Sequence, residues 1–245
     1  MNGSARVWVV VPAFDEAATI AAIVRDCRAR AEGVIVVDDG STDNTARIAA
    51  EAGAIVLRQR ANRGKGASLR RGMAAALARG AALVVTMDGD GQHRPADLPA
   101  LLARARAASD RIVIGSRRAD RANAPRARAL ANRIADFWVS WAARHPVEDS
   151  QSGFRVYPAA ALRTLSGPPM ASGFAFESEM LIEAGRRGFA TVAVPIPAIY
   201  GSNLRRPSHF RPVRDVTRIV LLVGGKLLRR GMDPLGLWLS LRRRA

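Results

Sequence analysis

Cysteine is almost absent from this 245-residue chain, and so is any long apolar run. The single cysteine, Cys27, excludes a framework of disulfides and suits a reducing compartment. Residues 1–6 are polar and only a short apolar run follows them, which is not the pattern of a secretory signal peptide. Near the C-terminus the longest apolar run, residues 219–225, is too short to cross a bilayer. These absences predict a cytoplasmic protein.

Lysine is nearly missing as well, and arginine supplies most of the positive charge. Lys65 and Lys226 are the only lysines, yet the net charge is +17, from 38 basic and 21 acidic residues. Residues 201–245 contain eleven basic and two acidic residues. A field of this sign favours phosphate groups, anionic lipid or nucleic acid as partners. Nucleic acid is not the expected partner, because no basic motif is interleaved with aromatic residues; a non-enzymatic nucleic-acid-binding protein stays as an alternative of another class.

Short β-branched runs alternate with alanine-rich helical stretches through the N-terminal half of the chain. This pattern predicts an α/β protein with a mostly parallel central sheet and helices on both faces. Strands are expected at residues 7–11, 34–37, 55–57, 83–87, 112–114 and 191–194, and helices at 17–30, 43–52, 65–79, 95–107, 125–144 and 176–186. Ligands of such sheets bind beyond the carboxyl ends of the strands, so residues that follow strands are the candidates for a site.

The segment T-M-D-G-D-G-Q-H, residues 86–93, follows one of these strands. It places side-chain oxygens on every second residue, at Asp88, Asp90 and Gln92. If the segment stays extended, alternate side chains point the same way and the three oxygens converge. Mg²⁺ or Mn²⁺ prefers such ligands, whereas a polar turn with an aspartate helix cap is the simpler alternative.

Two further segments carry polar groups at strand ends. Residues 34–45, V-I-V-V-D-D-G-S-T-D-N-T, place adjacent carboxylates before a turn, where one could accept hydrogen bonds from a base or ribose and Asp43 could cap a helix. Residues 62–72, N-R-G-K-G-A-S-L-R-R-G, are basic and glycine-rich, but Gln59 stands where a Walker loop needs its first glycine. No G-x-G-x-x-G follows the first strand, which disfavours a dinucleotide-binding Rossmann domain.

Together these segments resemble glycosyltransferase family 2, and more closely its dolichol-phosphate (polyprenyl-phosphate) mannosyltransferase-like branch. The matching segments are, in order, VVPAFDEAATI, VVDDGSTDNT, NRGKGASLRRG, MDGDGQH, GSRR, DSQSGFRVY, FAFESEML and SHFRPVRD, which cover about residues 7–215. The resemblance implies a GT-A-type nucleotide-diphosphosugar transferase fold. We therefore expect a GT-A-like domain over residues 1–215, followed by a basic, amphipathic helical tail over residues 216–245.

The resemblance also implies roles for individual residues. It places Pro12, Phe14, Glu16 and Asp39 at the nucleotide, Asp88, Asp90 and Gln92 at the metal and diphosphate, Arg117 near a phosphate, and Asp149 and Arg155 on the sugar and acceptor side. Catalytic roles are expected for Asp90, Arg117 and Asp149, phosphate or acceptor binding for Lys65, Glu177, Arg205, Arg206, His209 and Arg211, and a supporting role for His93. Chemistry supports a Mg²⁺ or Mn²⁺ cofactor, because a divalent cation neutralises a diphosphate leaving group. Arginine forks in turn suit phosphate geometry.

These inferences predict an inverting, metal-dependent glycosyltransferase. It would move a hexose from a nucleotide-diphosphate sugar of the GDP-mannose or UDP-glucose type to polyprenyl phosphate or another membrane-associated lipid. One alternative is a family member that glycosylates a hydroxyl, with Asp149 or Glu177 as general base. A sugar-1-phosphate nucleotidyltransferase is disfavoured, because no G-x-G-T-R-like loop follows the first strand.

Apolar residues also recur at helical spacing in two segments outside these motifs. Leu130, Ile134, Phe137, Trp138 and Trp141 form a stripe that favours packing in the core or at an interface. In the tail, Leu221, Leu222, Leu227, Leu228 and Trp238 alternate with Arg214 and Arg218. This pattern suggests helices lying on the anionic inner face of the cytoplasmic membrane, and packing of the C-terminal helix on the domain or on a partner is the alternative.

Overall fold

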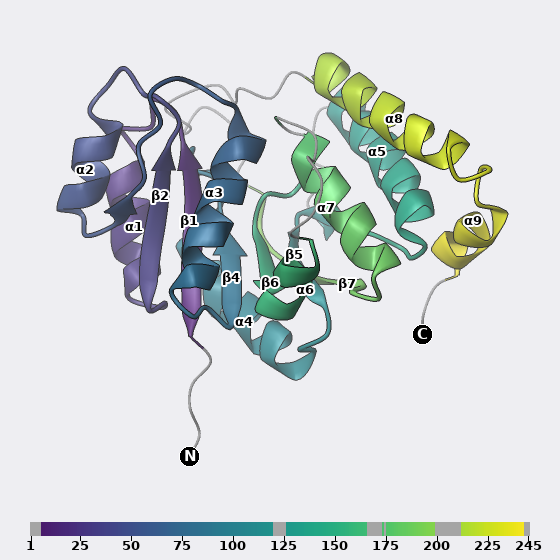
Figure 1. The fold of residues 1–245 in the computed structure, drawn as a ribbon, viewed down its shortest axis with the longest axis horizontal. Coiled ribbons are helices and arrows are strands. Elements are labelled where there is room, and N and C mark those ends of the chain that lie inside the picture. Colours follow the sequence, from purple (N-terminus) through teal and green to yellow (C-terminus); the bar gives the residue numbers. More distant parts are fainter. Residues whose placement is uncertain (1–5, 120–125, 166–172, 174, 199–211, 243–245) are drawn as a thin grey trace.

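One central sheet organises the fold in the computed structural model, which describes residues 6–119, 126–165, 173, 175–198 and 212–242 (Figure 1). Its seven strands follow the order β3-β2-β1-β4-β6-β5-β7. They are β1 (Val7–Ala13), β2 (Gly33–Asp38), β3 (Ile55–Val56), β4 (Leu83–Thr86), β5 (Ile112–Ser116), β6 (Arg155–Pro158) and β7 (Thr191–Pro195). Strand β6 is antiparallel to β4 and β5, and the other neighbours are parallel. The predicted mostly parallel sheet is confirmed.

Helices cover both faces of the sheet, because alternate strand residues point to opposite sides. Val9 and Val11 of β1 pack in one apolar cluster with residues of α1 (Ile20–Arg28), α2 (Thr45–Glu51) and α4 (Leu98–Ala107). Val10 of the same strand faces a second cluster on the other side. That cluster is built with α3 (Lys65–Ala78), α5 (Arg126–Ala143), α6 (Ala159–Thr164), α7 (Ala175–Arg186) and α8 (Pro212–Leu228). A short 3-10 helix, η1 (Pro95–Asp97), leads into α4, and α9 (Pro234–Leu241) follows α8.

Two elements of secondary structure were not predicted, and the predicted apolar stripe on α5 is only partly buried. Strand β6 and helix α6 occupy residues 155–164, where the sequence pattern predicted neither. On α5, Trp138 and Trp141 pack against the core as expected. Leu130 and Phe137 of the same stripe are exposed, so of the two predicted environments the core holds only the inner part of the stripe.

The C-terminal segment packs on the rest of the chain through one face of α8. Ile219, Val223 and Leu227 are buried in the same cluster as residues of α5 and α7, and Figure 1 shows α8 running beside α5. The predicted division between residues 215 and 216 falls inside α8. No helix among the described residues is both long enough and apolar enough to cross a membrane.

An ion-pair network joins α8 to α7. It should make the stability of the fold depend on pH in the acidic range. Glu183 of α7 lies 2.8 Å from Lys226 Nζ and 3.1 Å from Arg230 Nη2. Burial favours its neutral form, but hydrogen bonds and charge from Lys226, Arg187 and Arg230 lower the pKa of Glu183 to about 2. A carboxylate with a depressed pKa stabilises the fold fully above its ordinary pKa of 4.5, and this stabilisation is lost as the pH falls towards 2.

Replacing Glu183 with glutamine should therefore lower the melting temperature at pH 7 by a few degrees, roughly the effect of 1 kcal/mol in a domain of this size. The difference from the wild type should shrink between pH 4.5 and pH 2, the range over which Glu183 takes up its proton. Glu51→Gln is the matched control, because the Arg47–Glu51 pair is about 60% exposed on both sides. An equal effect of both substitutions at pH 7 would contradict a special role for the α7–α8 network.

Candidate active site

The predicted site residues gather at the carboxyl ends of four strands. Phe14 and Glu16 follow β1, Asp39 follows β2, Asp88 follows β4 and Arg117 follows β5. Lys65 is the first residue of α3 and comes to the same edge of the sheet. Parallel strands bring their carboxyl ends together, which explains why residues so distant in sequence meet here.

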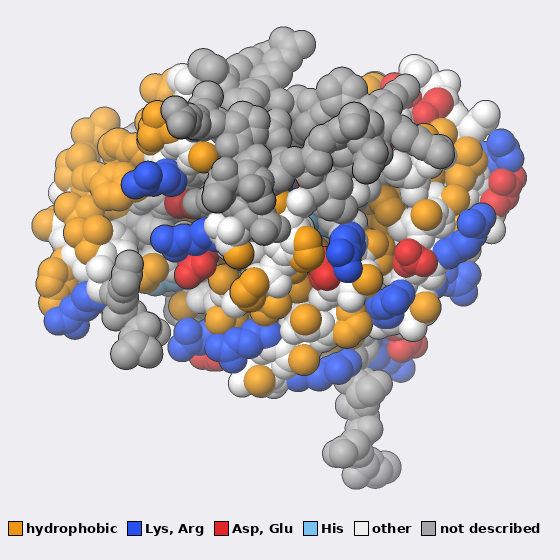
Figure 2. All heavy atoms as spheres, turned by 180° about the vertical axis from the view of Figure 1, so that it is seen from behind, with side chains coloured by type: hydrophobic (Ala, Val, Ile, Leu, Met, Phe, Trp, Pro, Cys, Tyr) orange, Lys and Arg blue, Asp and Glu red, His pale blue; other side chains and the backbone are white. Residues whose placement is uncertain are grey.

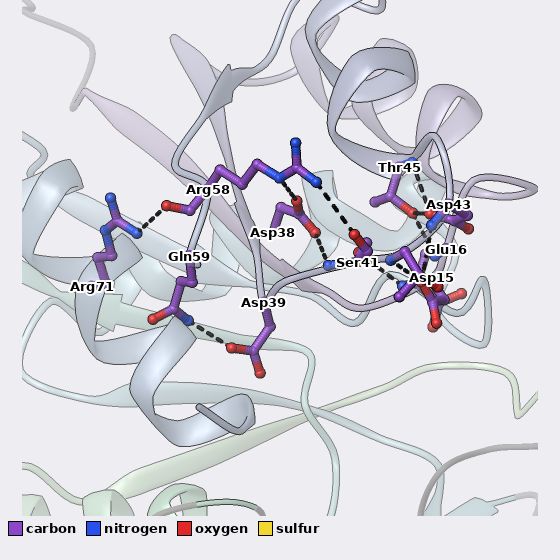
Figure 3. Close-up of polar contacts among 11 residues, drawn as sticks. Asp15, Glu16, Asp38, Asp39, Ser41, Asp43, Thr45, Arg58, Gln59 and Arg71 are labelled. Atoms are coloured by element: carbon purple, nitrogen blue, oxygen red, sulfur yellow. Dashed lines mark hydrogen bonds and ion pairs between the residues drawn. The ribbon is translucent and has the colours of Figure 1, made fainter. Parts of the chain in front are cut away.

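The loops after β1 and β2 are joined by a set of short hydrogen bonds (Figure 3). The backbone N–H of Asp15 donates to Ser41 Oγ at 2.9 Å, and that of Glu16 donates to Thr45 Oγ1 at 2.7 Å. The Asp15 carboxylate in turn accepts from the backbone N–H of Thr42 at 2.8 Å. These contacts hold Asp15 in a left-handed conformation, with φ +55°. The edge where a nucleotide is expected is therefore a rigid double loop.

Asp39 shapes the glycine-rich loop in front of α3. Its buried carboxylate accepts from Gln59 Nε2 at 2.8 Å and from the backbone N–H groups of Arg63 and Gly64 at 2.8 and 2.9 Å. Figure 3 shows Asp39 and Gln59 pointing toward each other. Gly64 has φ +87°, a conformation that glycine adopts at little cost. Asp39 thus positions the loop that delivers Lys65, and its role as a nucleotide ligand stays a prediction.

Lys65 bridges two carboxylates that come from distant parts of the chain. Its Nζ lies 2.6 Å from Asp88 Oδ1 and 2.7 Å from Glu177 Oε2, at the start of α7. Burial alone would lower the pKa of Lys65, but the two carboxylates hold it above its ordinary value, so the side chain is an ammonium. The other oxygen of Glu177, Oε1, is buried without a hydrogen-bond partner within the described part of the chain. No local sequence pattern indicates this bridge.

The D-G-D-G segment turns instead of staying extended. The chain bends at Gly89 and Asp90, and Gly91 has φ +77°. The backbone N–H of Gln92 donates to Asp90 Oδ1 at 3.0 Å, and Thr19 Oγ1 anchors the turn by donating to the carbonyl of Gly89 at 2.6 Å. The expectation that strand alternation would align three side chains is therefore wrong, since glycine allows a turn at this point.

Asp88 and Asp90 still form an electrostatically coupled pair. Burial raises the pKa of Asp90, and the Asp88 carboxylate raises it further. The pKa of Asp88 is lowered despite burial, because Lys65 and His93 lie next to it. No group of three or more His, Cys, Asp or Glu side chains in the described ranges is arranged as a metal site. Asp88 is paired with Lys65, and Asp90 beside it adds a second carboxylate of the kind that a hard divalent cation prefers.

His93 lies next to Asp88, where a supporting residue is expected. It is buried, its Nε2 lies 3.7 Å from Asp88 Oδ2, and its ring lies 5.5 Å from that of Phe154. Burial lowers the pKa of His93 to about 4, although Asp88 opposes this shift. The imidazole is therefore neutral at pH 7.

Arg117 and Asp149 form a two-pronged pair beside this cluster. Arg117 donates to the Asp149 carboxylate from Nε at 3.0 Å, from Nη2 at 3.0 Å and from its backbone N–H at 2.9 Å. Asp149 is buried and has φ +49°, a strained backbone that these bonds hold in place. A carboxylate occupied in this way orients Arg117 and is poorly placed to accept a proton from a substrate.

Arg155 does not reach the site surface, which corrects the prediction that it binds an acceptor or phosphate. The side chain is fully buried, and its guanidinium donates to the carbonyls of Ser150, Ser152 and Glu177 and to Tyr157 Oη. It therefore ties the loop before β6 to the start of α7. Sequence reasoning missed this role because a buried arginine without an ion pair has no signature in the residue pattern.

Gly153 leaves the space in which Asp88 sits, and filling that space should disturb the site. A Cβ at this position would lie 2.6 Å from Asp88 Oδ2. We expect Gly153→Ala to displace the carboxylate from Lys65 and to lower the rate of the reaction at this site at least about tenfold, since misplacement by an ångström is costly in catalysis. Gly224→Ala is the matched control, because nothing lies within 4 Å of a Cβ there. Unchanged kinetics in Gly153→Ala would show that the position of Asp88 is unimportant.

Four predicted phosphate or acceptor residues, Arg205, Arg206, His209 and Arg211, lie outside the described residues. The described site thus brings together Lys65, Asp88 and Glu177, places Asp90 beside them and adds the Arg117–Asp149 pair. Pro12 is the penultimate residue of β1, next to the loop that carries Phe14 and Glu16.

Comparison with known proteins identifies the class of this site. Residues 8–163 match the family Glycosyl transferase family 2. The chain is 31% identical over 203 residues to an undecaprenyl-phosphate mannosyltransferase of Micrococcus luteus, covering 78% of this chain and 82% of that one. It is 29% identical over 245 residues to a UDP-N-acetylglucosamine–dolichyl-phosphate N-acetylglucosaminyltransferase of Methanococcus voltae, covering 91% and 98%.

A similar solved structure is glucosyl-3-phosphoglycerate synthase from Mycobacterium tuberculosis in complex with Mg²⁺ and uridine diphosphate. The TM-score is 0.66 at 25% sequence identity, and the match covers 94% of this chain and 81% of that one. The expected GT-A-like arrangement of sheet and helices is thereby confirmed.

Proposed function

Since the chain belongs to glycosyl transferase family 2, we propose that this glycosyltransferase moves a hexose, with inversion, from a nucleotide-diphosphate sugar to a polyprenyl phosphate. The cluster of Lys65, Asp88, Asp90 and Glu177 at the strand ends carries this proposal. It combines one ammonium with several carboxylates at the edge where ligands of such sheets bind. The relatives named for transfer to undecaprenyl and dolichyl phosphate support the lipid acceptor.

The donor would lie along the loops that follow β1 and β2. The rigid double loop around Asp15 and Ser41 would receive the nucleotide, and Lys65 would approach its diphosphate from the start of α3. When bound, Mg²⁺ or Mn²⁺ held by Asp88 and Asp90, with Gln92 beside them, would supply the Lewis acid that neutralises the leaving diphosphate. The solved complex of a similar protein with Mg²⁺ and uridine diphosphate supports a divalent cation here.

The acceptor side favours a phosphate over a hydroxyl. A lipid phosphate is already an anion near neutral pH and can attack the anomeric carbon without a protein base. It needs a positive group to position it, and Arg117 is oriented for this by Asp149. A hydroxyl acceptor would need a general base, but both oxygens of Asp149 accept from Arg117 and Glu177 is ion-paired with Lys65 through one of its oxygens.

Binding of nucleoside diphosphates tests the donor half of the proposal. Isothermal titration of the full chain should show binding of uridine or guanosine diphosphate that strengthens when Mn²⁺ is present. The matching monophosphates, which lack the second phosphate, should bind more weakly. If neither diphosphate binds with Mn²⁺ and the chain instead binds DNA with a steep salt dependence, the non-enzymatic nucleic-acid-binding alternative replaces the transferase proposal.

A further inference from the structure

The exposed apolar side chains of the described residues are confined to one region. Every large hydrophobic side chain that is exposed there lies on α5, α8, α9 or the turn joining α8 to α9. Figure 2 shows hydrophobic side chains gathered on that side of the molecule, at the left of the view. We define the apolar belt by six of these side chains, which are 43% to 70% exposed: Leu130, Phe137, Leu221, Leu228, Trp238 and Leu241.

Helical spacing places the belt residues on the outer faces of their helices. Leu130 and Phe137 are seven residues apart on α5, as Leu221 and Leu228 are on α8, and that spacing returns to the same side of a helix. The opposite side of α8 is buried in the core. The belt residues therefore do not take part in the packing that holds these helices on the core, and their hydrophobic surface is available for another contact.

Polar contacts fix the helices that carry the belt. Asp233, just before α9, accepts from Arg144 Nε at 2.8 Å and from Arg186 Nη1 at 2.8 Å. Trp141 of α5 donates from Nε1 to the carbonyl of Asp233 at 3.0 Å. Helix α9 is thus anchored to α5 and α7, so the belt is presented in a defined geometry.

Exposed arginines accompany the apolar belt on each helix. Arg133 lies on α5, Arg229 follows α8, and Arg242 follows α9, where its guanidinium carbon stands 3.4 Å from the centre of the Trp238 ring. Leucine and tryptophan next to arginine form the combination that lies at the boundary between acyl chains and anionic headgroups. A second copy of the chain is a poorer occupant, because a twofold interface through the belt would bring two arginine-bearing faces together.

We propose that the apolar belt rests on an anionic lipid bilayer and so holds the protein at the surface in which a lipid acceptor would lie. This inference rests on the proposed function for the identity of the acceptor, but the belt's contact with lipid is a property of the surface itself. Burying a single leucine or tryptophan side chain strengthens binding about tenfold or more, so removal of two such residues should be easy to detect.

Co-sedimentation with vesicles tests the belt without any measurement of activity. The full chain should bind vesicles of phosphatidylcholine mixed with phosphatidylglycerol. Leu221→Glu/Trp238→Glu should bind at least about tenfold more weakly. The control Ala100→Glu/Ala103→Glu adds the same charge to exposed positions of α4 and should bind like the wild type. Leu221→Ser/Trp238→Ala, which adds no charge, should also lose most of the binding, and circular dichroism should show all variants folded.

Three results would overturn the inference. The full chain could fail to bind the vesicles, or the belt variants could bind as tightly as the wild type. Alternatively, sedimentation velocity could show a dimer that the belt variants abolish, which would make the belt a self-association surface. Transfer to a short, water-soluble polyprenyl phosphate should persist in the belt variants. If no form of the protein uses that acceptor while vesicle binding still depends on the belt, the proposed acceptor is wrong and the membrane contact stands.

Discussion

Replacing Asp90 with asparagine should lower the rate of sugar transfer by about 100- to 1,000-fold, the usual cost of losing a group that stabilises developing charge. The substitution keeps the shape of the side chain and removes a carboxylate from the site proposed to hold Mg²⁺ or Mn²⁺. The measurement is kcat/KM for the donor over a range of Mn²⁺ concentrations. The variant should also need more Mn²⁺ to reach its own maximum.

Stability provides the internal control for this substitution. Burial and Asp88 raise the pKa of Asp90, so its charged form is unfavourable in the folded protein at pH 7. Asp90→Asn should therefore be at least as stable as the wild type. Asp26→Asn, on the exposed face of α1, removes the same charge away from the site and should leave the kinetics unchanged. An Asp90→Asn enzyme with full activity and unaltered metal dependence would remove Asp90 from the mechanism.

Replacing Arg155 with methionine should cost about 3 kcal/mol or more of unfolding free energy, because each buried acceptor that loses its donor costs about 1–3 kcal/mol. The substitution leaves three backbone carbonyls and the hydroxyl of Tyr157 without their donor. It also removes the positive charge that faces Glu177 and Asp149. Urea unfolding measures the loss, and a large fall in the transition midpoint is expected.

Two further variants show whether the lower unfolding free energy is caused by removal of the buried Arg155 guanidinium. Arg163→Met, on the exposed surface of α6, should change the stability by less than about 0.5 kcal/mol. Arg155→Lys keeps the charge but cannot fork toward several carbonyls, so it should fall between the wild type and Arg155→Met. If Arg155→Met unfolds at the wild-type urea concentration but loses transferase activity, the residue belongs to the acceptor site after all.

The order of strands and helices in the N-terminal half could be predicted because each element has a characteristic residue pattern within its own segment. Apolar β-branched runs such as residues 34–37 became strands, and alanine-rich stretches such as residues 65–79 became helices. Strand β6 escaped prediction because its sequence, R-V-Y-P, begins with an arginine and ends with a proline. It is a strand because β4 and β5 flank it in the folded sheet, which is a tertiary effect.

The location of the site at the strand ends could be predicted from the sequence, but the contacts between its side chains could not. The predicted strand ends placed Asp39 and Asp88 at one edge of the sheet, since parallel strands bring their carboxyl ends together. Arg117, which only the family resemblance indicated, follows β5 at the same edge. The bridge from Lys65 to Glu177 joins residues more than a hundred positions apart, and no local pattern encodes such a pair. The prediction of extended chain at Gly89 was wrong, because the backbone turns there.

The acceptor gives the most direct test of the central claim. The purified chain, with Mn²⁺ and either UDP-glucose or GDP-mannose, should be offered a short polyprenyl phosphate and, separately, the polyprenol of the same length. We expect sugar to be transferred to the phosphate and not to the polyprenol, because the site offers cationic positioning and the carboxylates of Asp149 and Glu177 are paired with Arg117 and Lys65. Transfer to the polyprenol or to a sugar hydroxyl, with none to the phosphate, would contradict it.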